Sequence, residues 1–240
     1  NIIVERSMYW DAGGVNWSGG HESAGVTTPA TTWYLAEDYT GGSFDTYALI
    51  QNPTASTATI TATYMIQGES PVSKSYTVNA NSRYTVYVND EVGAGKSVST
   101  KFVSDQDIIV ERAMYWDSGG TNWKEGHDSA GVTTPATTWY LAEGYTGGSF
   151  DTYALIQNPT ASTATITATY MIQGESPVSK SYTVNANSRY TVYVNDEVGA
   201  GKSVSTKFVS NQNIIVERSM YWDAGGVNWS AGHNCSGVSL

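Results

Sequence analysis

The sequence has a single cysteine, few basic residues and no long apolar run. Cys235 has no second cysteine in the 240 residues with which to form a disulfide, so it is a free thiol or bonds to another molecule. The 12 Lys and Arg are outnumbered by 22 Asp and Glu, which gives a net charge of −10. Such a chain cannot neutralise a phosphate backbone, so we expect no nucleic-acid partner. No apolar run approaches the roughly 18 residues that cross a bilayer, so we expect no membrane span.

One phrase is repeated along the chain. Nearly the same residues, "IIVER.MYW", follow Asn1, Asp107 and Asn213, so the period is 106 residues, the size of a compact domain. The copies at 1–106 and 107–212 differ at nine positions, and none of these lies between Tyr39 and Ser104. The sequence therefore predicts a recently duplicated module.

The turn residues suggest where each unit begins. Residues 117–136 are long, rich in glycine and contain proline, as in a linker, whereas "SDQD" at 104–107 is short enough for a hairpin turn. We therefore predict β-domains at 27–132 and 133–240, with "IIVER.MYW" as the last strand of each unit. Residues 1–26 are then the last strand and linker of a preceding or partner unit.

The alternation of apolar and polar residues predicts an all-β fold. In "TATITATYMI" (57–66), Ala and Ile alternate with Thr, as in a half-buried antiparallel strand. "SRYTVYVND" has the same period and places Tyr84, Val86 and Val88 inward. Each unit has about seven such strands, separated by Gly, Pro, Asn and Ser turns, and no convincing helix. This pattern predicts tandem immunoglobulin-like or fibronectin-like β-sandwich domains.

A Gly-Gly turn with flanking oxygen side chains is a candidate calcium site. "WDAGGVNW" and "WDSGGTNW" place an Asp and an Asn on either side of the turn, and Ca²⁺ accepts such hard ligands on a flexible loop. The spacing is not that of an EF-hand, and Asp-x-Gly-Gly is also an ordinary turn. The candidate ligands are Asp11, Asn16, Asp117, Asn122, Asp223 and Asn228. We expect no other cofactor.

Charged and aromatic residues near the linkers are candidate structural contacts. Buried carboxylates persist only when they are paired, so we expect Arg112 or Arg83 to lie against Glu111 or Glu143, at the domain junction in one arrangement. The tryptophans either stack on sugar rings or hold one domain against the next, and the second reading suits a stiff junction better. The candidate structural residues are Trp10, Trp17, Trp33, Glu37, Arg83, Glu111, Arg112, Trp116, Trp123, Trp139 and Glu143.

Catalytic groups are not suggested by the sequence. Each unit has one histidine with a serine close by in sequence, as in "GGHESAG", but triads normally assemble from separate elements and no G-x-S-x-G is present. We therefore expect that the protein is not an enzyme.

The phrases "ERAMYW", "TTWYLAEGYTGGSFDTYALIQNPT" and "NSRYTVYVND" resemble repeats of large bacterial secreted and surface proteins. That resemblance implies an exported, repetitive, structural role in arrays of β-sandwich modules, and it carries no catalytic residue.

We therefore expect an extracellular cell-surface protein that forms a stalk, adhesin spacer or filament by end-to-end stacking. Its partners would be neighbouring repeats or further copies, with strand donation by residues 2–10 as one route. The alternative is a carbohydrate-binding adhesive module that binds a surface glycan. The candidate assembly residues are Ile2, Ile3, Val4, Met8 and Cys235.

Overall fold

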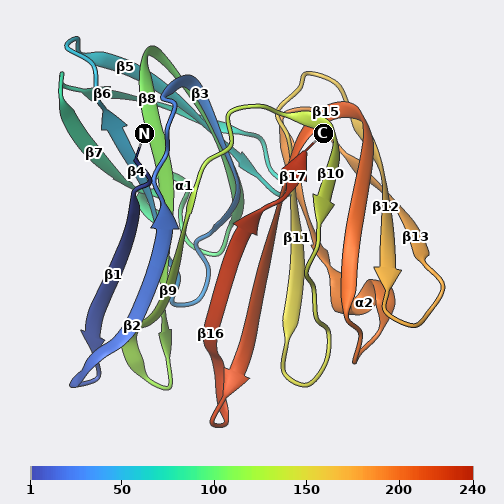
Figure 1. The fold of residues 1–240 in the computed structure, drawn as a ribbon. Helices are drawn as coiled ribbons and strands as arrows, with labels where there is room; N and C mark the ends of the chain where they lie inside the picture. The colour runs from blue at the N-terminus through green and yellow to red at the C-terminus, as the bar shows by residue number, and fades with distance from the viewer. Residues whose placement is uncertain (1, 240) are drawn as a thin grey trace.

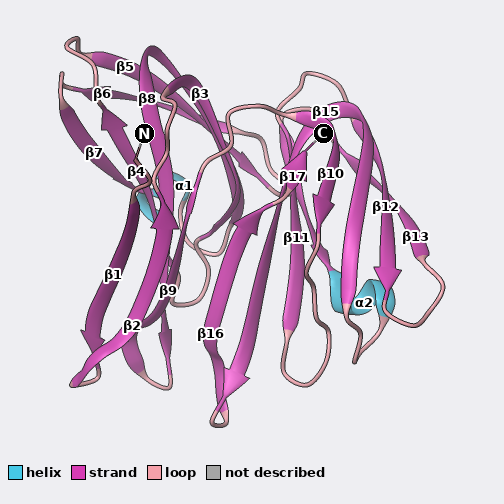
Figure 2. Cartoon of the chain, viewed as in Figure 1, coloured by secondary structure: helices cyan, strands magenta, loops and turns pink. Residues whose placement is uncertain are grey.

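Antiparallel β-strands make up most of the molecule. The computed structural model describes residues 2–239, so residues 1 and 240, at the outer limits of the predicted domain ranges, lie outside the described part. Strands account for 68% of the chain and helices for 4%, which confirms the all-β prediction. Figure 2 shows the sheets side by side, with two short helices at their margins.

The chain begins with a two-stranded hairpin, which we call the first hairpin (residues 5–24). Strands β1 (Glu5–Ala12) and β2 (Val15–Ala24) pair from Glu5 opposite Ala24 to Ala12 opposite Val15. Gly13 and Gly14 close the hairpin with φ of 62° and 76°, a left-handed geometry that glycine adopts without strain.

Seven strands and a short helix form the first unit. They are β3 (Ala30–Tyr39), β4 (Asp45–Asn52), β5 (Ala58–Ile66), β6 (Val72–Val78), β7 (Ser82–Tyr87), α1 (Val88–Val92), β8 (Ser97–Ser118) and β9 (Thr121–Ala130).

Strand β8 belongs to two sheets. Its first part pairs with β5 and β3, for example Phe102 with Ala62 and Trp33. Its second part pairs with β4 and β9, and Arg112 lies opposite Ala48 and Ser129. The two sheets therefore have the orders β6-β5-β8-β3 and β7-β4-β8-β9, and β8 joins them.

Two expectations about this region were wrong. The "SDQD" segment is not a hairpin turn, because β8 continues through it and Gln106 N–H donates to the Ser104 hydroxyl at 3.1 Å. The segment 117–136 is not a linker over most of its length, because 121–130 form β9, the strand that follows "IIVERAMYW". The glycines there serve a tight turn, and β9 with the end of β8 forms the second hairpin (residues 111–130).

The second unit repeats the first. Its elements are β10 (Ala136–Leu141), β11 (Asp151–Asn158), β12 (Ala164–Ile172), β13 (Val178–Val184), β14 (Ser188–Tyr193), α2 (Val194–Val198), β15 (Val204–Ala224), β16 (Val227–Ser236) and β17 (Val238–Ser239). Strand β15 again runs through two sheets, and with β16 it forms the third hairpin (residues 217–236). Figure 1 shows the three hairpins on the same side of the molecule.

Each unit has its own hydrophobic core, to which both of its sheets contribute, and Tyr34 and Ala36 of the first unit pack with the core of the second. The alternation predicted for β5 is confirmed, because Ala58, Ile60 and Ala62 are fully buried while Thr59 and Thr61 face solvent. Of the residues predicted to point inward on the later strand, Val86 and Val88 are buried. Tyr84 was wrongly placed and is 44% exposed.

The helices were missed because they are too short to show a helical period. In α1, the Asn89 side chain accepts a hydrogen bond from Thr46 N–H at 3.0 Å and donates one to the Phe44 carbonyl at 2.7 Å. These tertiary bonds stabilise a turn that five residues would not hold alone. Among residues 2–239, no helix is long and apolar enough to cross a membrane.

The separate cores predict separate responses to a cavity. Phe102→Ala should destabilise the first unit by about 3 to 5 kcal/mol, because a fully buried aromatic ring is removed, and Phe208→Ala should do the same to the second unit. Hydrogen exchange with mass spectrometry would show this in peptides from β9 and β16, which differ in sequence. Equal loss of protection in both units from either variant would contradict separate cores.

Candidate functional site

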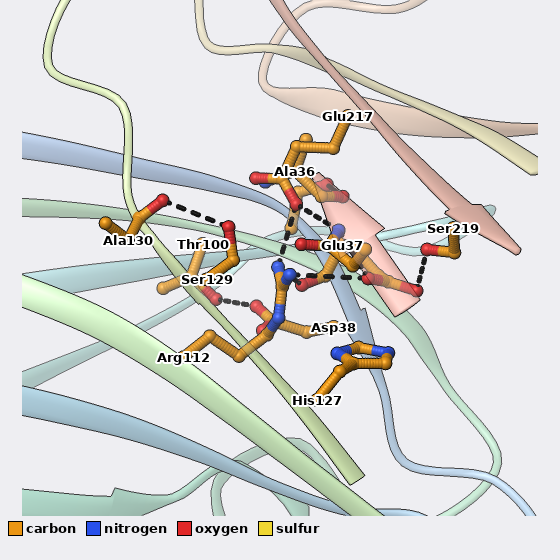
Figure 3. Close-up of polar contacts among 12 residues, drawn as sticks. Ala36, Glu37, Asp38, Thr100, Arg112, His127, Ser129, Ala130, Glu217 and Ser219 are labelled. Carbon is orange, nitrogen blue, oxygen red and sulfur yellow. Dashed lines mark hydrogen bonds and ion pairs between the residues drawn. The ribbon is translucent and has the colours of Figure 1, made fainter. Parts of the chain in front are cut away.

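A buried arginine lies at the contact between the two units. Arg112 on β8 is completely buried. Its Nη2 lies 3.3 Å from Glu37 Oε2 on β3 of the same unit, and its Nη1 lies 2.9 Å from Glu217 Oε2 on β15 of the second unit. Figure 3 shows the guanidinium among these groups. We call Arg112, Glu37 and Glu217 the junction triad.

Both carboxylates of the junction triad have further hydrogen bonds. Glu217 Oε1 accepts from Ala36 N–H at 2.8 Å, so the second unit is bonded to the backbone of β3. Glu37 accepts from Tyr221 Oη at 2.9 Å and from the Ser219 hydroxyl. Asn234 Nδ2 donates to Glu37 at 2.8 Å and to Glu217 at 3.1 Å. Burial lowers the pKa of Arg112, but the two glutamates outweigh this effect, and the net shift is upward.

A third carboxyl group lies beside the triad. Asp38 is buried and accepts a hydrogen bond from Thr100 Oγ1 at 2.6 Å. Burial raises its pKa to about 7, against the opposing effects of Arg112 and Thr100. The second unit has Gly144 at the equivalent position, so this group is present once.

The sheets of the two units also contact each other beside the triad. Arg189 on β14 is buried and donates from Nε to Ser99 Oγ at 3.0 Å, and its Nη1 lies 3.3 Å from Gln67 Oε1. Burial lowers the pKa of Arg189 to about 10. Its equivalent in the first unit, Arg83, is exposed and donates to Thr85 Oγ1. Arg83 lines an open groove of about 1030 Å³ between the first hairpin and the first unit.

The three hairpins contact one another through the same pairs of residues. Trp10 Nε1 donates to the Trp123 carbonyl at 2.7 Å, and Trp116 Nε1 donates to the Trp229 carbonyl at 2.8 Å. A second pair repeats in the same way. His21 Nε2 lies 3.3 Å from Tyr115 Oη, and His127 Nε2 lies 3.2 Å from Tyr221 Oη.

Glycine makes room for each of these tryptophans. A Cβ at Gly126 would lie 2.7 Å from the Tyr115 ring of its own hairpin and 3.1 Å from Trp10, and one at Gly232 would lie 2.6 Å from Tyr221 and 3.1 Å from Trp116. The backbone of each hairpin therefore has to remain bare where the preceding tryptophan crosses it.

The arginine contact is repeated with one change. Arg6 pairs with Glu111 at 2.7 Å, as Arg112 pairs with Glu217, and it also pairs with Asp128. Asn234 is the equivalent of Asp128. The second carboxylate partner of Arg6 is therefore Asp128. The second carboxylate partner of Arg112 is Glu37, and the neutral Asn234 takes the position of Asp128. Each junction thus places two carboxylates against one guanidinium.

The arginine and glutamates that the sequence predicted as partners of one another pair with other residues in the structure. Arg112 contacts Glu37 and Glu217, while Glu111 pairs with Arg6, and Glu143 pairs with Arg218 at 2.9 Å. Glu217 and Arg6 were not singled out from the sequence, although each lies 106 residues from a residue that was. Applying the repeat to every candidate would have found them.

The predicted tryptophans have three roles. Trp33 and Trp139 are buried within their own units and donate to the carbonyls of Ile108 and Ile214, each at 2.8 Å. Trp10 and Trp116 lie between hairpins, as described above. Trp123 donates to Asp45 Oδ2 at 2.5 Å, and Trp17 is 76% exposed.

The candidate calcium ligands lie at the hairpin turns. The carboxylates of Asp11, Asp117 and Asp223 accept the backbone N–H of the tryptophan six residues later, at 2.8 to 2.9 Å. Those tryptophans have φ near 50°, so the bond supports a left-handed residue. The asparagines Asn16, Asn122 and Asn228 are exposed. No group of three or more His, Cys, Asp or Glu suited to a metal occurs within residues 2–239. Calcium binding stays a prediction.

The candidate assembly residues are mostly exposed. Ile2 and Ile3 are 87% and 92% exposed, and Val4 and Met8 also face solvent. Cys235 is a half-buried free thiol on β16, and burial raises its pKa.

Comparison with known proteins gives only distant structural similarity. No family model and no curated protein matches the chain. The crystal structure of Thermotoga maritima 1070 is 14% identical and covers 45% of this chain and 97% of its own, with a TM-score of 0.39. The Anabaena sensory rhodopsin transducer is 20% identical and covers 37% and 99%, with a TM-score of 0.33. Allantoicase from Saccharomyces cerevisiae is 7% identical and covers 80% and 77%, with a TM-score of 0.20. These values carry no argument about function.

The burial of the junction triad predicts unequal effects for two equivalent arginines. Arg112→Ala should cost about 3 to 5 kcal/mol, because it leaves two buried carboxylates without their cation. Arg218→Ala is the matched comparison and should cost less, because Arg218 is also buried but the side chain of its partner Glu143 is 61% exposed and is solvated by water once the cation is removed. Urea denaturation followed by circular dichroism measures both, and equal losses would contradict the role of burial.

The raised pKa of Asp38 predicts a pH-dependent effect of its replacement. The folded state binds this proton more tightly than the unfolded state, so the stability it contributes is lost as the pH rises through about 7. Asp38→Asn should therefore stabilise the protein by about 1 to 2 kcal/mol at pH 8. The gain should shrink as the pH falls and disappear only below about pH 4, where Asp38 is protonated in both the folded and the unfolded state. Urea denaturation across this range tests it, and a gain independent of pH would point to another cause.

Proposed function

We propose that this protein is an extracellular structural repeat protein, in which tandem immunoglobulin-like or fibronectin-like β-sandwich units are held in a fixed relation to form a stiff rod. Within each unit, two sheets share one core and are joined by a single long strand, which supports the sandwich interpretation. Such a rod serves as a stalk or a spacer that holds another part of an assembly at a distance.

The observation that carries this proposal is the repetition of the same contact at an interval of 106 residues. Arg6 with Glu111 and Arg112 with Glu217 are successive copies of one ion pair, and the tryptophan and histidine contacts repeat with them. A contact that repeats by translation along the chain produces a linear array, and nearest-neighbour contacts then stabilise every unit added.

Burial of charge at the contact supports stiffness. Two units that move freely on a flexible linker would not bury an arginine side chain between them. Here the junction triad is hydrogen-bonded from both units, so any change in their relative orientation exposes unpaired buried groups. The extracellular location rests on the resemblance to secreted and surface repeats and on the scarcity of charged residues, which are 14% of the chain.

Small-angle X-ray scattering tests the stiffness. The wild-type chain should give one pair-distance distribution, unchanged between about 0.05 and 1 M salt, because the ions of the triad are shielded from solvent. Arg112→Ala should broaden the distribution, and Arg218→Ala should leave it unchanged. A wild-type distribution that requires an ensemble of unit orientations would refute the rod.

A further inference from the structure

Each hairpin has two different faces. The forward face presents the indole N–H, the arginine and the histidine to the following hairpin. The rear face presents a tryptophan carbonyl, a glutamate and a tyrosine hydroxyl to the preceding one. The first hairpin contacts the second, and the second contacts the third, always forward face to rear face.

The forward face of the third hairpin is open. Trp222 is half-buried, whereas its equivalent Trp116 is 1% exposed. No hydrogen bond from Trp222 Nε1 is found within residues 2–239. Arg218 is only 5% exposed, but its partner Glu143 is largely exposed, and the side chain of His233 is 39% exposed.

The rear face of the first hairpin is open as well. Tyr9 is 63% exposed and Trp17 is 76% exposed, and their rings stack on each other at 5.7 Å. Tyr221, the equivalent of Tyr9 in the third hairpin, is 5% exposed because the second hairpin covers it. The space over Gly20 is also free of any tryptophan from another hairpin, while Gly126 and Gly232 are each crossed by one.

We propose that the forward face of the third hairpin binds the rear face of the first hairpin of a second copy of this chain. Each pair is obtained from a contact between the second and third hairpins. Adding 106 to the number of the forward-face residue places it in the third hairpin, and subtracting twice 106 from that of the rear-face residue places it in the first hairpin. Trp116 with Trp229 becomes Trp222 with the Trp17 carbonyl. Arg112 with Glu217 becomes Arg218 with Glu5, and His127 with Tyr221 becomes His233 with Tyr9.

The chemistry of the two faces favours a second copy over a sugar. A sugar would use the exposed Tyr9 and Trp17 rings, but it would make no use of the Glu5 carboxylate or of the Trp222 indole N–H, which is unbonded within the described residues. The same residue types already bind each other twice within the chain. The contact joins unlike faces, so each copy keeps one free face for a further copy, and the assembly grows beyond a dimer. This inference rests on the proposed function, and it extends the array from units to molecules.

One residue makes this contact weaker than the internal ones. Glu22 takes the position of Asp128 and Asn234. Glu143, Glu5 and Glu22 would then face Arg218. Around Arg112 the corresponding groups are Glu37, Glu217 and the neutral Asn234, and the nearby Asp38 has a pKa raised to about 7 by burial. Glu22→Asn should therefore strengthen the association.

Analytical ultracentrifugation from about 1 to 500 µM, with a reducing agent to keep Cys235 free, tests the contact. The wild type should form larger species as its concentration rises. Arg218→Glu and Glu5→Arg should each weaken the association about tenfold or more, because a like-charge pair replaces the ion pair. The double variant should regain it, and Glu22→Asn should associate more tightly than the wild type. Circular dichroism checks that each variant is folded.

The outcomes separate this inference from the function on which it rests. Monomers at every concentration for both the wild type and Glu22→Asn would overturn the contact, as would oligomers that ignore both charge reversals. Quenching of tryptophan fluorescence by oligosaccharides in a chain that stays monomeric would overturn it in favour of glycan binding. The proposed rod is judged independently, by the scattering of the monomer.

Discussion

The arrangement of the two units depends on one buried charge. Arg112 lies in the middle of a strand, completely removed from water, and its two carboxylate partners come from different units. The cost of burying a guanidinium is offset only when both partners are in place. The relative position of the units is therefore tied to the stability of the first unit, and the contact cannot loosen without leaving charges unpaired.

Because the sequence repeats, the same residue types serve at successive junctions in slightly different surroundings. The few differences between copies lie where those surroundings differ. At the position shared by Asp128 and Asn234, the acid Asp128 pairs with Arg6, whereas the amide Asn234 lies beside Arg112, which already pairs with Glu37. Variation in the hairpins and at Asp38, which Gly144 replaces, therefore alters the charge at the contacts, while residues 39–104 stay unchanged in the next copy.

The sequence was sufficient for most strands, but not for β9 or for the connections between strands. Alternation identified β5 because one of its faces is buried and the other is wet. It could not show that β8 passes from one sheet to the next, since both halves of this strand carry the same apolar pattern and only tertiary pairing distinguishes a bend from a turn. The glycines of residues 117–136 suggested a linker, yet Gly119 and Gly120 close the hairpin turn, and Gly126 on β9 lies against aromatic rings. The sequence also indicated that Arg112 needs a carboxylate, but the partner from the second unit follows from the stacking geometry.

The polar character of the contact also limits which faces can meet. An apolar patch would accept many surfaces, and identical neighbouring units are prone to mispairing. A contact built from an arginine, an indole N–H and a bare glycine accepts only a face that supplies a carboxylate, a carbonyl and the matching space, because any other surface leaves buried polar groups without partners. The hairpins offer these complementary faces in one direction only, so units that stack through them are added with a defined polarity.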